Sequence, residues 1–147
     1  MIRKPGVAVA AAAVGLIGFA GPAQADDIDG TNGPDLLLGT PNNDTIRGFA
    51  ADYVLGQQGA DKVIGADGYD DVRGGDSADT VRGNDQGDDV YPGPGAGSAY
   101  GGSGNDDMYV TVDHKPDLID CGDGDDTVHT GGSIDPLDAF PHCENFV

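Results

Sequence analysis

Aspartate residues recur at a constant interval through the middle of the chain, and they are the side chains best placed to do chemistry. Asp52, Asp61, Asp70, Asp79 and Asp88 follow one another at intervals of nine residues without interruption. Carboxylates are hard oxygen ligands, and Ca²⁺ takes about six to eight oxygen atoms from carboxylates and backbone carbonyls. This row of acids therefore indicates an array that binds cations.

Apolar residues and glycines keep the same register as the aspartates. Two positions after each aspartate of the central block stand Val54, Val63, Val72, Val81 and Val90. Towards the N-terminus the frame continues, after a slip of one residue, as Asp44 with Ile46 and Asp35 with Leu37. Towards the C-terminus it gives the weakened unit Gly97 with Ala99, then Asp106 with Met108 and, after an insertion of two residues, Asp117 with Ile119, Asp126 with Val128 and Asp135 with Leu137. Glycine stands five residues before the aspartate at positions 30, 39, 56, 65, 74, 83 and 101.

This pattern predicts an all-β chain built from turns and very short strands. Six residues that include glycine can form a tight turn, and the remaining three, such as 71–73, suffice for a minimal strand whose middle residue points inward. Two turns and two strands make a coil of 18 residues, and stacked coils bury a thin apolar core that no single unit could bury. Stacking also brings like-charged aspartates together, which is unfavourable unless a cation lies between them.

The unit GGSGNDDMY at residues 101–109 matches the repeat G-G-x-G-x-D-x-U-x at every specified position. Over residues 28–138 the chain resembles the RTX-type (hemolysin-type) calcium-binding nonapeptide repeat family. The resemblance implies a parallel β-roll, with Ca²⁺ bound by the aspartate that ends each turn and by carbonyl oxygens of the turn. By that resemblance the ligand role falls to Asp35, Asp44, Asp52, Asp61, Asp70, Asp79, Asp88, Asp106, Asp117 and Asp126.

A second carboxylate stands three residues before some of these aspartates, at Asp67, Asp76, Asp85 and Asp123. Leaving out the degenerate turns of Asp35 and Asp117, the predicted metal ligands are Asp44, Asp52, Asp61, Asp67, Asp70, Asp76, Asp79, Asp85, Asp88, Asp106, Asp123 and Asp126. Turns one coil apart should stack, which gives the unbroken row 52–70–88–106. The other row, 44–61–79, meets Gly97 and should lose or weaken a site there.

The N-terminal 25 residues have the composition of a secretory signal peptide. A basic start at Arg3 and Lys4 precedes an apolar stretch over residues 7–20 and the A-x-A pattern at residues 23–25. The alternative is an uncleaved anchor. Cleavage would leave a calcium-binding domain over residues 26–147 with 26 acidic and five basic residues, a net charge of −21, and we expect it to be secreted.

The acidic charge bears on possible partners. Nucleic acid and an anionic membrane surface would both repel such a chain. Residues 26–147 contain no apolar run of 18 residues, so no membrane insertion is expected there. Calcium ions are the expected partner, and a cell-envelope or glycan partner is left open.

Cys121 and Cys143 are the only cysteines, and in an exported chain they predict a disulfide that staples the C-terminal end. Two free thiols are the alternative. His114, His129 and His142 have no metal-ligand spacing and are expected to be solvated.

Tyr91, Tyr100 and Tyr109 also recur at intervals of nine, on the outside of the predicted strands. They form either an outer ladder, with Tyr91 beside Tyr109, or a strip that binds sugars or surfaces. The segment 93–102 lacks the lysine of a phosphate loop, and Glu144 does not end an EF-hand loop.

The sequence therefore predicts a secreted calcium-binding protein that folds on binding Ca²⁺ and has no enzymatic activity. The rival from a different class is a structural or adhesive cell-surface protein that calcium stiffens. A small glycan-active enzyme is a third alternative, which no catalytic motif supports.

Overall fold

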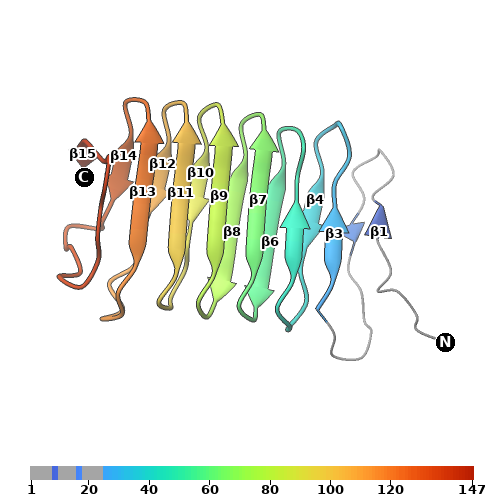
Figure 1. Cartoon of the computed structure of the whole chain (residues 1–147), viewed down its shortest axis with the longest axis horizontal. Helices are drawn as coiled ribbons and strands as arrows, with labels where there is room; N and C mark the ends of the chain where they lie inside the picture. The colour runs from blue at the N-terminus through green and yellow to red at the C-terminus, as the bar shows by residue number, and fades with distance from the viewer. Residues whose placement is uncertain (1–7, 10–15, 18–24) are drawn as a thin grey trace.

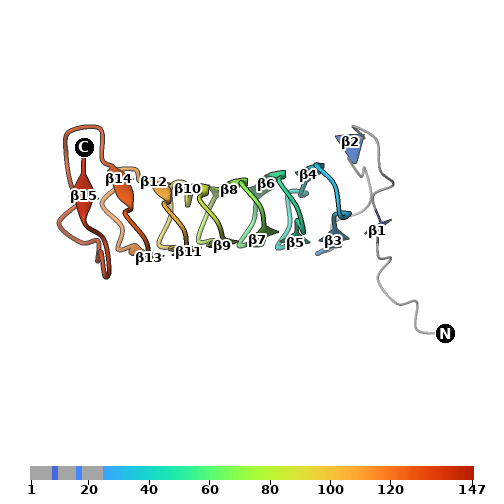
Figure 2. The same ribbon diagram turned by 90° about the horizontal axis from the view of Figure 1, so that it is seen from above.

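The computed structural model describes residues 8–9, 16–17 and 25–147, and all the regular structure in these residues is β-strand (Figure 1). Successive strands alternate between two parallel sheets that face each other, so the chain forms a flattened solenoid (Figure 2). The predicted parallel β-roll is confirmed.

The first sheet contains, in spatial order, β1 (Ala8–Val9), β3 (Asp27–Asp29), β5 (Thr45–Arg47), β7 (Lys62–Asp67), β9 (Thr80–Asp85), β11 (Ser98–Ser103) and β13 (Leu118–Asp123). The second contains β2 (Leu16–Ile17), β4 (Leu36–Leu38), β6 (Tyr53–Gln58), β8 (Asp71–Asp76), β10 (Asp89–Tyr91), β12 (Asp107–Tyr109), β14 (Thr127–His129) and β15 (Asn145–Phe146). Each strand from β1 to β12 pairs with the strand two places further along the chain, because each coil passes once through each sheet. In the tail, β15 pairs with the strand directly before it, β14.

The register follows the nine-residue repeat and its slips. Val54 pairs with Val72 and Val63 with Val81, a separation of one 18-residue coil. The one-residue slip and the two-residue insertion also appear in the pairing, where Leu37 faces Val54 and Ala99 faces Ile119. The turns absorb these changes of length, so the apolar column stays in register.

The core is a single line of apolar side chains between the sheets. Each strand of the repeat contributes its second residue, and each such residue is fully or almost fully buried: Ile28, Leu37, Ile46, Val54, Val63, Val72, Val81, Val90, Ala99, Met108, Ile119 and Val128. Each coil therefore buries only two or three apolar side chains, which is little to offset the entropy of ordering 18 residues.

Two features differ from the sequence-based expectation. Strands β6, β7, β8, β9, β11 and β13 are six residues long rather than three, because the first turn residues continue the parallel ladder, as in the pairs Gln57–Gly75 and Ala66–Asn84. The last frame is wrong: Leu137 is 54% exposed, and Ala139 instead bridges to Leu118.

Most of the predicted signal peptide lies outside the described residues. Of that segment, β1 pairs with β3 and β2 pairs with β4 at one end of the solenoid. The described part of the chain contains no helix of the length and apolarity needed to cross a bilayer.

Candidate metal centre

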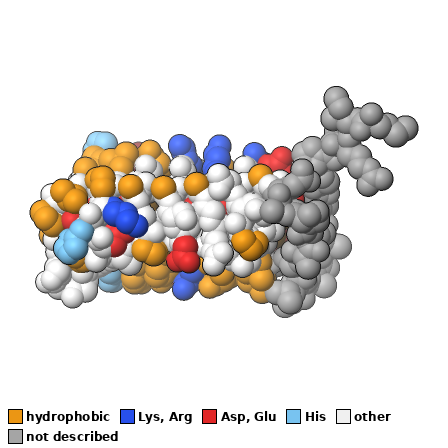
Figure 3. All heavy atoms as spheres, turned by 90° about the horizontal axis from the view of Figure 1, so that it is seen from below, with side chains coloured by type: hydrophobic (Ala, Val, Ile, Leu, Met, Phe, Trp, Pro, Cys, Tyr) orange, Lys and Arg blue, Asp and Glu red, His pale blue; other side chains and the backbone are white. Residues whose placement is uncertain are grey.

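The aspartate that ends each turn has its side chain inside the solenoid. Each of these residues directly precedes a strand, and its carboxylate folds back under the turn. The buried members of the set are Asp44, Asp52, Asp61, Asp70, Asp79, Asp88, Asp106, Asp117 and Asp126. Figure 3 looks onto one row of turns, where uncharged atoms cover most of the face and few acidic side chains are visible.

One oxygen of each carboxylate links neighbouring coils. The backbone N–H of Asp52 donates to Oδ1 of Asp70 (2.7 Å), and that of Asp70 donates to Oδ1 of Asp88 (2.8 Å). The same bond joins Asp35 to Asp52, Asp44 to Asp61, Asp61 to Asp79, Asp88 to Asp106 and Asp106 to Asp126. The stacking of turns one coil apart is therefore as the sequence predicts.

The row that contains Asp79 is interrupted at Gly97, also as the sequence predicts. Gly97 directly precedes β11 and brings no carboxylate to the row. Five residues earlier, where complete turns have glycine, this turn has Pro92. The row resumes one coil later, where the N–H of Gly97 donates to Oδ1 of Asp117 (2.7 Å).

In most of these turns the second carboxylate oxygen is buried without a hydrogen-bond partner. Among the described residues, buried Oδ2 atoms that lack a hydrogen-bond partner belong to Asp61, Asp70, Asp79, Asp88, Asp106, Asp126 and Asp138. Desolvation raises the pKa of Asp70 to about 6, of Asp79 to about 7 and of Asp88 to about 8. An ionised carboxylate in this position is costly unless a cation pairs with it.

A backbone carbonyl oxygen approaches the same place as the unpaired Oδ2. The point that a Cβ on Gly74 would occupy lies 2.6 Å from Oδ2 of Asp79 and 2.5 Å from the carbonyl oxygen of Pro92 in the next coil. At Gly83 the same two kinds of atom converge, from Asp88 and Gly101. Carboxylate and carbonyl oxygens are the donor set that Ca²⁺ prefers, so the residues of these turns fit the ion.

The second set of predicted carboxylates lies elsewhere. Asp67, Asp76, Asp85 and Asp123 are exposed at the ends of their strands, while the aspartates that end the turns are buried. Their charges still reach the turns, because Asp67 contributes to raising the pKa of Asp70. Across the described ranges, no three His, Cys, Asp or Glu side chains converge in a group that could hold a metal ion by themselves. A site in the turns therefore needs further oxygen ligands, which the turn carbonyls can supply.

Two threonines that the sequence analysis did not single out contact the first two aspartates of the rows. The hydroxyl of Thr31 donates to Oδ2 of Asp35 (2.9 Å), and that of Thr40 donates to Oδ2 of Asp44 (2.9 Å). Both threonines follow the glycine of the turn directly. In the best repeat unit, residues 101–109, this position is a second glycine. A β-branched residue in its place is the sequence signal that could have revealed the two threonines.

The outer face of the second sheet carries a stack of planar side chains. The rings of Tyr91 and Tyr109 are 4.3 Å apart and nearly parallel, so the predicted outer ladder is confirmed. His129 stacks on Tyr109 at 4.4 Å, and the guanidinium of Arg73 lies 4.2 Å from the ring centre of Tyr91. The stack covers both faces of each tyrosine ring, which leaves no free face in these two rings for a sugar to stack on.

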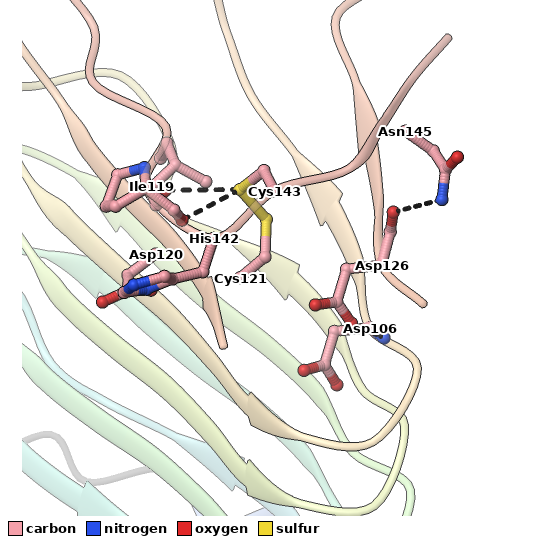
Figure 4. The surroundings of a disulfide bond; sticks show 9 residues. Asp106, Ile119, Asp120, Cys121, Asp126, His142, Cys143 and Asn145 are labelled. Atoms are coloured by element: carbon pink, nitrogen blue, oxygen red, sulfur yellow. Dashed lines mark hydrogen bonds and ion pairs between the residues drawn. A yellow bond between two sulfur atoms is a disulfide. The ribbon is translucent and has the colours of Figure 1, made fainter. Parts of the chain in front are cut away.

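The C-terminal end is closed by a disulfide. Cys121, buried in β13, is bonded to Cys143 in the tail, as the sequence predicts (Figure 4). Beside it, His142 Nδ1 lies 2.8 Å from Oδ1 of Asp120. His129 and His114 likewise lie beside single carboxylates, those of Asp107 and Asp135.

The fold and these turns define a class of protein, the parallel β-rolls whose turns bind cations. The family model of the RTX calcium-binding nonapeptide repeat matches the chain in four copies, over residues 23–48, 29–63, 48–72 and 55–91. No curated protein and no solved structure matches the chain significantly. The chain thus carries RTX-type calcium-binding repeats, and the ligand of these repeats is Ca²⁺. The coils continue in the same geometry beyond residue 91, to β14.

Proposed function

We propose that this is a secreted calcium-binding protein whose repeats fold when the turns bind Ca²⁺. The observation that carries the proposal is the row of buried Oδ2 atoms without partners, since each leaves a negative charge in the interior that a cation would neutralise. The proposed ligands are the buried aspartates of the central turns, together with turn carbonyl oxygens: Asp52, Asp61, Asp70, Asp79, Asp88, Asp106 and Asp126.

Coupling of folding to binding follows from charge and core size. The segment 26–147 carries a net charge of −21, and its core is one residue wide. Without a cation, charge repulsion and chain entropy oppose the coil, so the free energy of ion binding becomes free energy of folding. An extracellular module of this kind is expected to bind Ca²⁺ in the range of about 10⁻⁴ to 10⁻³ M. Secretion is supported by the signal-peptide pattern of residues 1–25.

We propose a binding role rather than catalysis. Among the described residues, the buried acids other than Asp135 form one repeated array, with no pair set apart for acid and base work as glycosidases require. The structural or adhesive alternative is a second candidate, supported by the continuous parallel ladders of the two sheets. The stacked rings of Tyr91 and Tyr109 count against the sugar-stacking form of that alternative.

Circular dichroism tests the proposal directly. The chain over residues 26–147 is stripped of calcium. Its β signal and melting temperature are followed during titration with CaCl₂, and MgCl₂ serves as the matched control. We expect a cooperative gain of β signal with Ca²⁺ and little with Mg²⁺, which requires near-octahedral geometry and dehydrates reluctantly. Identical spectra and melting temperatures with and without Ca²⁺ would refute coupled folding. Calcium-dependent binding to cell envelopes would favour the adhesive alternative.

A further inference from the structure

The first two turns of the solenoid satisfy their aspartates with side chains of the chain itself. Oδ2 of Asp35 accepts hydrogen bonds from the backbone N–H (2.5 Å) and hydroxyl (2.9 Å) of Thr31. Oδ2 of Asp44 accepts the same two bonds from Thr40, at 2.5 and 2.9 Å. These oxygen atoms thus have two donors each, where the corresponding atom of Asp70 has none among the described residues.

The backbone conformation distinguishes the first two turns from the central turns. In the central turns the residue after the glycine has positive φ, as at Gln57 (84°), Ala66 (96°) and Asn84 (89°). These residues continue the strand ladder into the next coil, for example Gln57 with Gly75. A β-branched residue avoids positive φ, and Thr31 and Thr40 are not among the described residues that adopt it. Their N–H groups point at the carboxylate instead.

We propose that Thr31 and Thr40 take the place of the ion in their turns, so that Asp35 and Asp44 are not calcium ligands. The N-terminal turns over residues 30–35 and 39–44 are then closed without metal, and the calcium sites begin beyond them. This inference rests on the proposed function, because it assigns the sites among the turns.

The turn that ends at Asp52 lies between the two N-terminal turns and the central turns, and it supports the assignment. Asp52 ends a turn one residue shorter, and its Oδ2 accepts one long bond, from the N–H of Ala50 (3.3 Å). From Asp61 to Asp88, Oδ2 has no partner in the described chain. The number of groups that donate a hydrogen bond to Oδ2 thus falls from two at Asp35 and Asp44 to none from Asp61 to Asp88. A buried carboxylate oxygen with fewer donors has a greater need for a cation.

Counting bound ions tests the site assignment. Native mass spectrometry of the calcium-loaded full chain is compared for wild type, Asp35→Asn, Asp44→Asn and Asp70→Asn. We expect the wild-type number of ions in the first two variants and the loss of at least one ion in Asp70→Asn. Loss of an ion from Asp35→Asn would overturn the inference, as would its loss from Asp44→Asn with β6 and β7 still protected from hydrogen exchange. A wild-type chain that binds no Ca²⁺ would instead refute the proposed function.

Removing the hydroxyls tests the role of the threonines. In Thr31→Val/Thr40→Val we expect backbone amides of residues 27–47 to exchange about tenfold faster in saturating calcium, since a hydrogen bond to a carboxylate is lost in each turn. The ion count should stay that of wild type. Thr45→Val is the matched control, because Thr45 contacts Asp26 through its backbone N–H (2.9 Å), which valine retains. Equal exchange in the double variant and the control would overturn the inference.

Discussion

Oδ2 of Asp79 lies beside the place that a side chain on Gly74 would occupy. A Cβ built on Gly74 is 2.6 Å from that oxygen and 2.8 Å from the Cβ of Asp79, closer than real Cβ atoms approach. Gly65 and Asp70 are related in the same way. Gly74 and Gly65 are not among the described residues with positive φ. In these two turns the glycine therefore leaves room for the inward carboxylate, whereas the turn of Asp126 has Cys121 at the same position and accommodates its Cβ.

Gly74→Ala should consequently disturb the Asp79 turn although alanine suits the backbone there. We expect the free energy of unfolding in saturating calcium to fall by about 1–3 kcal/mol, the usual cost of overpacking, and the calcium midpoint to rise. Gly33→Ala is the control, because its nearest contact would be the Thr31 hydroxyl at 4.0 Å. Calcium titrations followed by circular dichroism measure both. Equal midpoints for the two variants would contradict the steric explanation.

Asp70→Ala should weaken calcium binding and folding more than Asp135→Ala. Asp70 stands in the middle of the unbroken row, with its Oδ2 unpaired, and a central defect interrupts coupling on both sides. Asp135 lies outside the rows, and its carboxylate accepts bonds from the N–H groups of His114 (2.6 Å) and Leu137 (3.1 Å). The calcium midpoints of the two variants decide the matter: if they coincide, the site assignment is wrong.

The repeat could be predicted from the sequence because each coil obeys the same local rule. The interval from Asp52 to Asp88 fixed the register, and a side chain two residues after each aspartate had to point inward. Glycine five residues before the acid was predicted as a turn former, whereas the structure shows that it also makes room for the carboxylate.

Other features could not be predicted, because they depend on contacts between coils. The strand ladder runs into the turn at Gln57 only because Gly75 lies beside it in the next coil. Leu137 keeps the nine-residue spacing but is exposed, because the disulfide-bonded tail follows a different path. Oδ2 of Asp35 and of Asp44 accepts a hydroxyl bond from the threonine four places earlier, a difference between turns that the spacing of acids does not reveal.

Acid should partly replace calcium in the ion-free chain. Burial raises the pKa of Asp88 to about 8 and of Asp79 to about 7, so the folded ion-free chain holds these protons more tightly than the unfolded chain does. Their stabilising contribution is complete below the unfolded pKa of about 4 and is lost as the pH rises through about 7 to 8. Protonation also lowers the net negative charge of the chain, and the weaker charge repulsion stabilises the ion-free fold further at low pH.

We therefore expect the calcium-stripped protein to gain β signal between pH 8 and pH 5, and calcium binding at pH 5, where the folded ion-free chain holds these protons, to release them. Circular dichroism in calcium-free buffers and proton release on titration with CaCl₂ measure the two effects. Stronger β signal at pH 8 than at pH 5 in the absence of calcium would show that the turn carboxylates are not buried in the ion-free fold.

Cys143→Ser should loosen the C-terminal end and leave the centre unchanged. The disulfide closes a loop between residues 22 apart, for which the chain-entropy model gives a stabilisation of about 3 kcal/mol. The tail also pairs with the last coil through its backbone, where the N–H of Ile119 donates to the carbonyl of Ala139 (2.8 Å) and that of Val147 donates to Val128 (3.0 Å). Because each coil contacts only its neighbours, the loss of an end cap affects only the coils next to it.

Hydrogen exchange in saturating calcium measures this effect in Cys143→Ser. We expect faster exchange after residue 117 and wild-type protection in β6 to β9, and wild type treated with a phosphine reductant should reproduce this pattern. Faster exchange throughout the solenoid would mean that the disulfide supports the whole fold, and two free thiols in the purified, unreduced protein would disprove the bond itself.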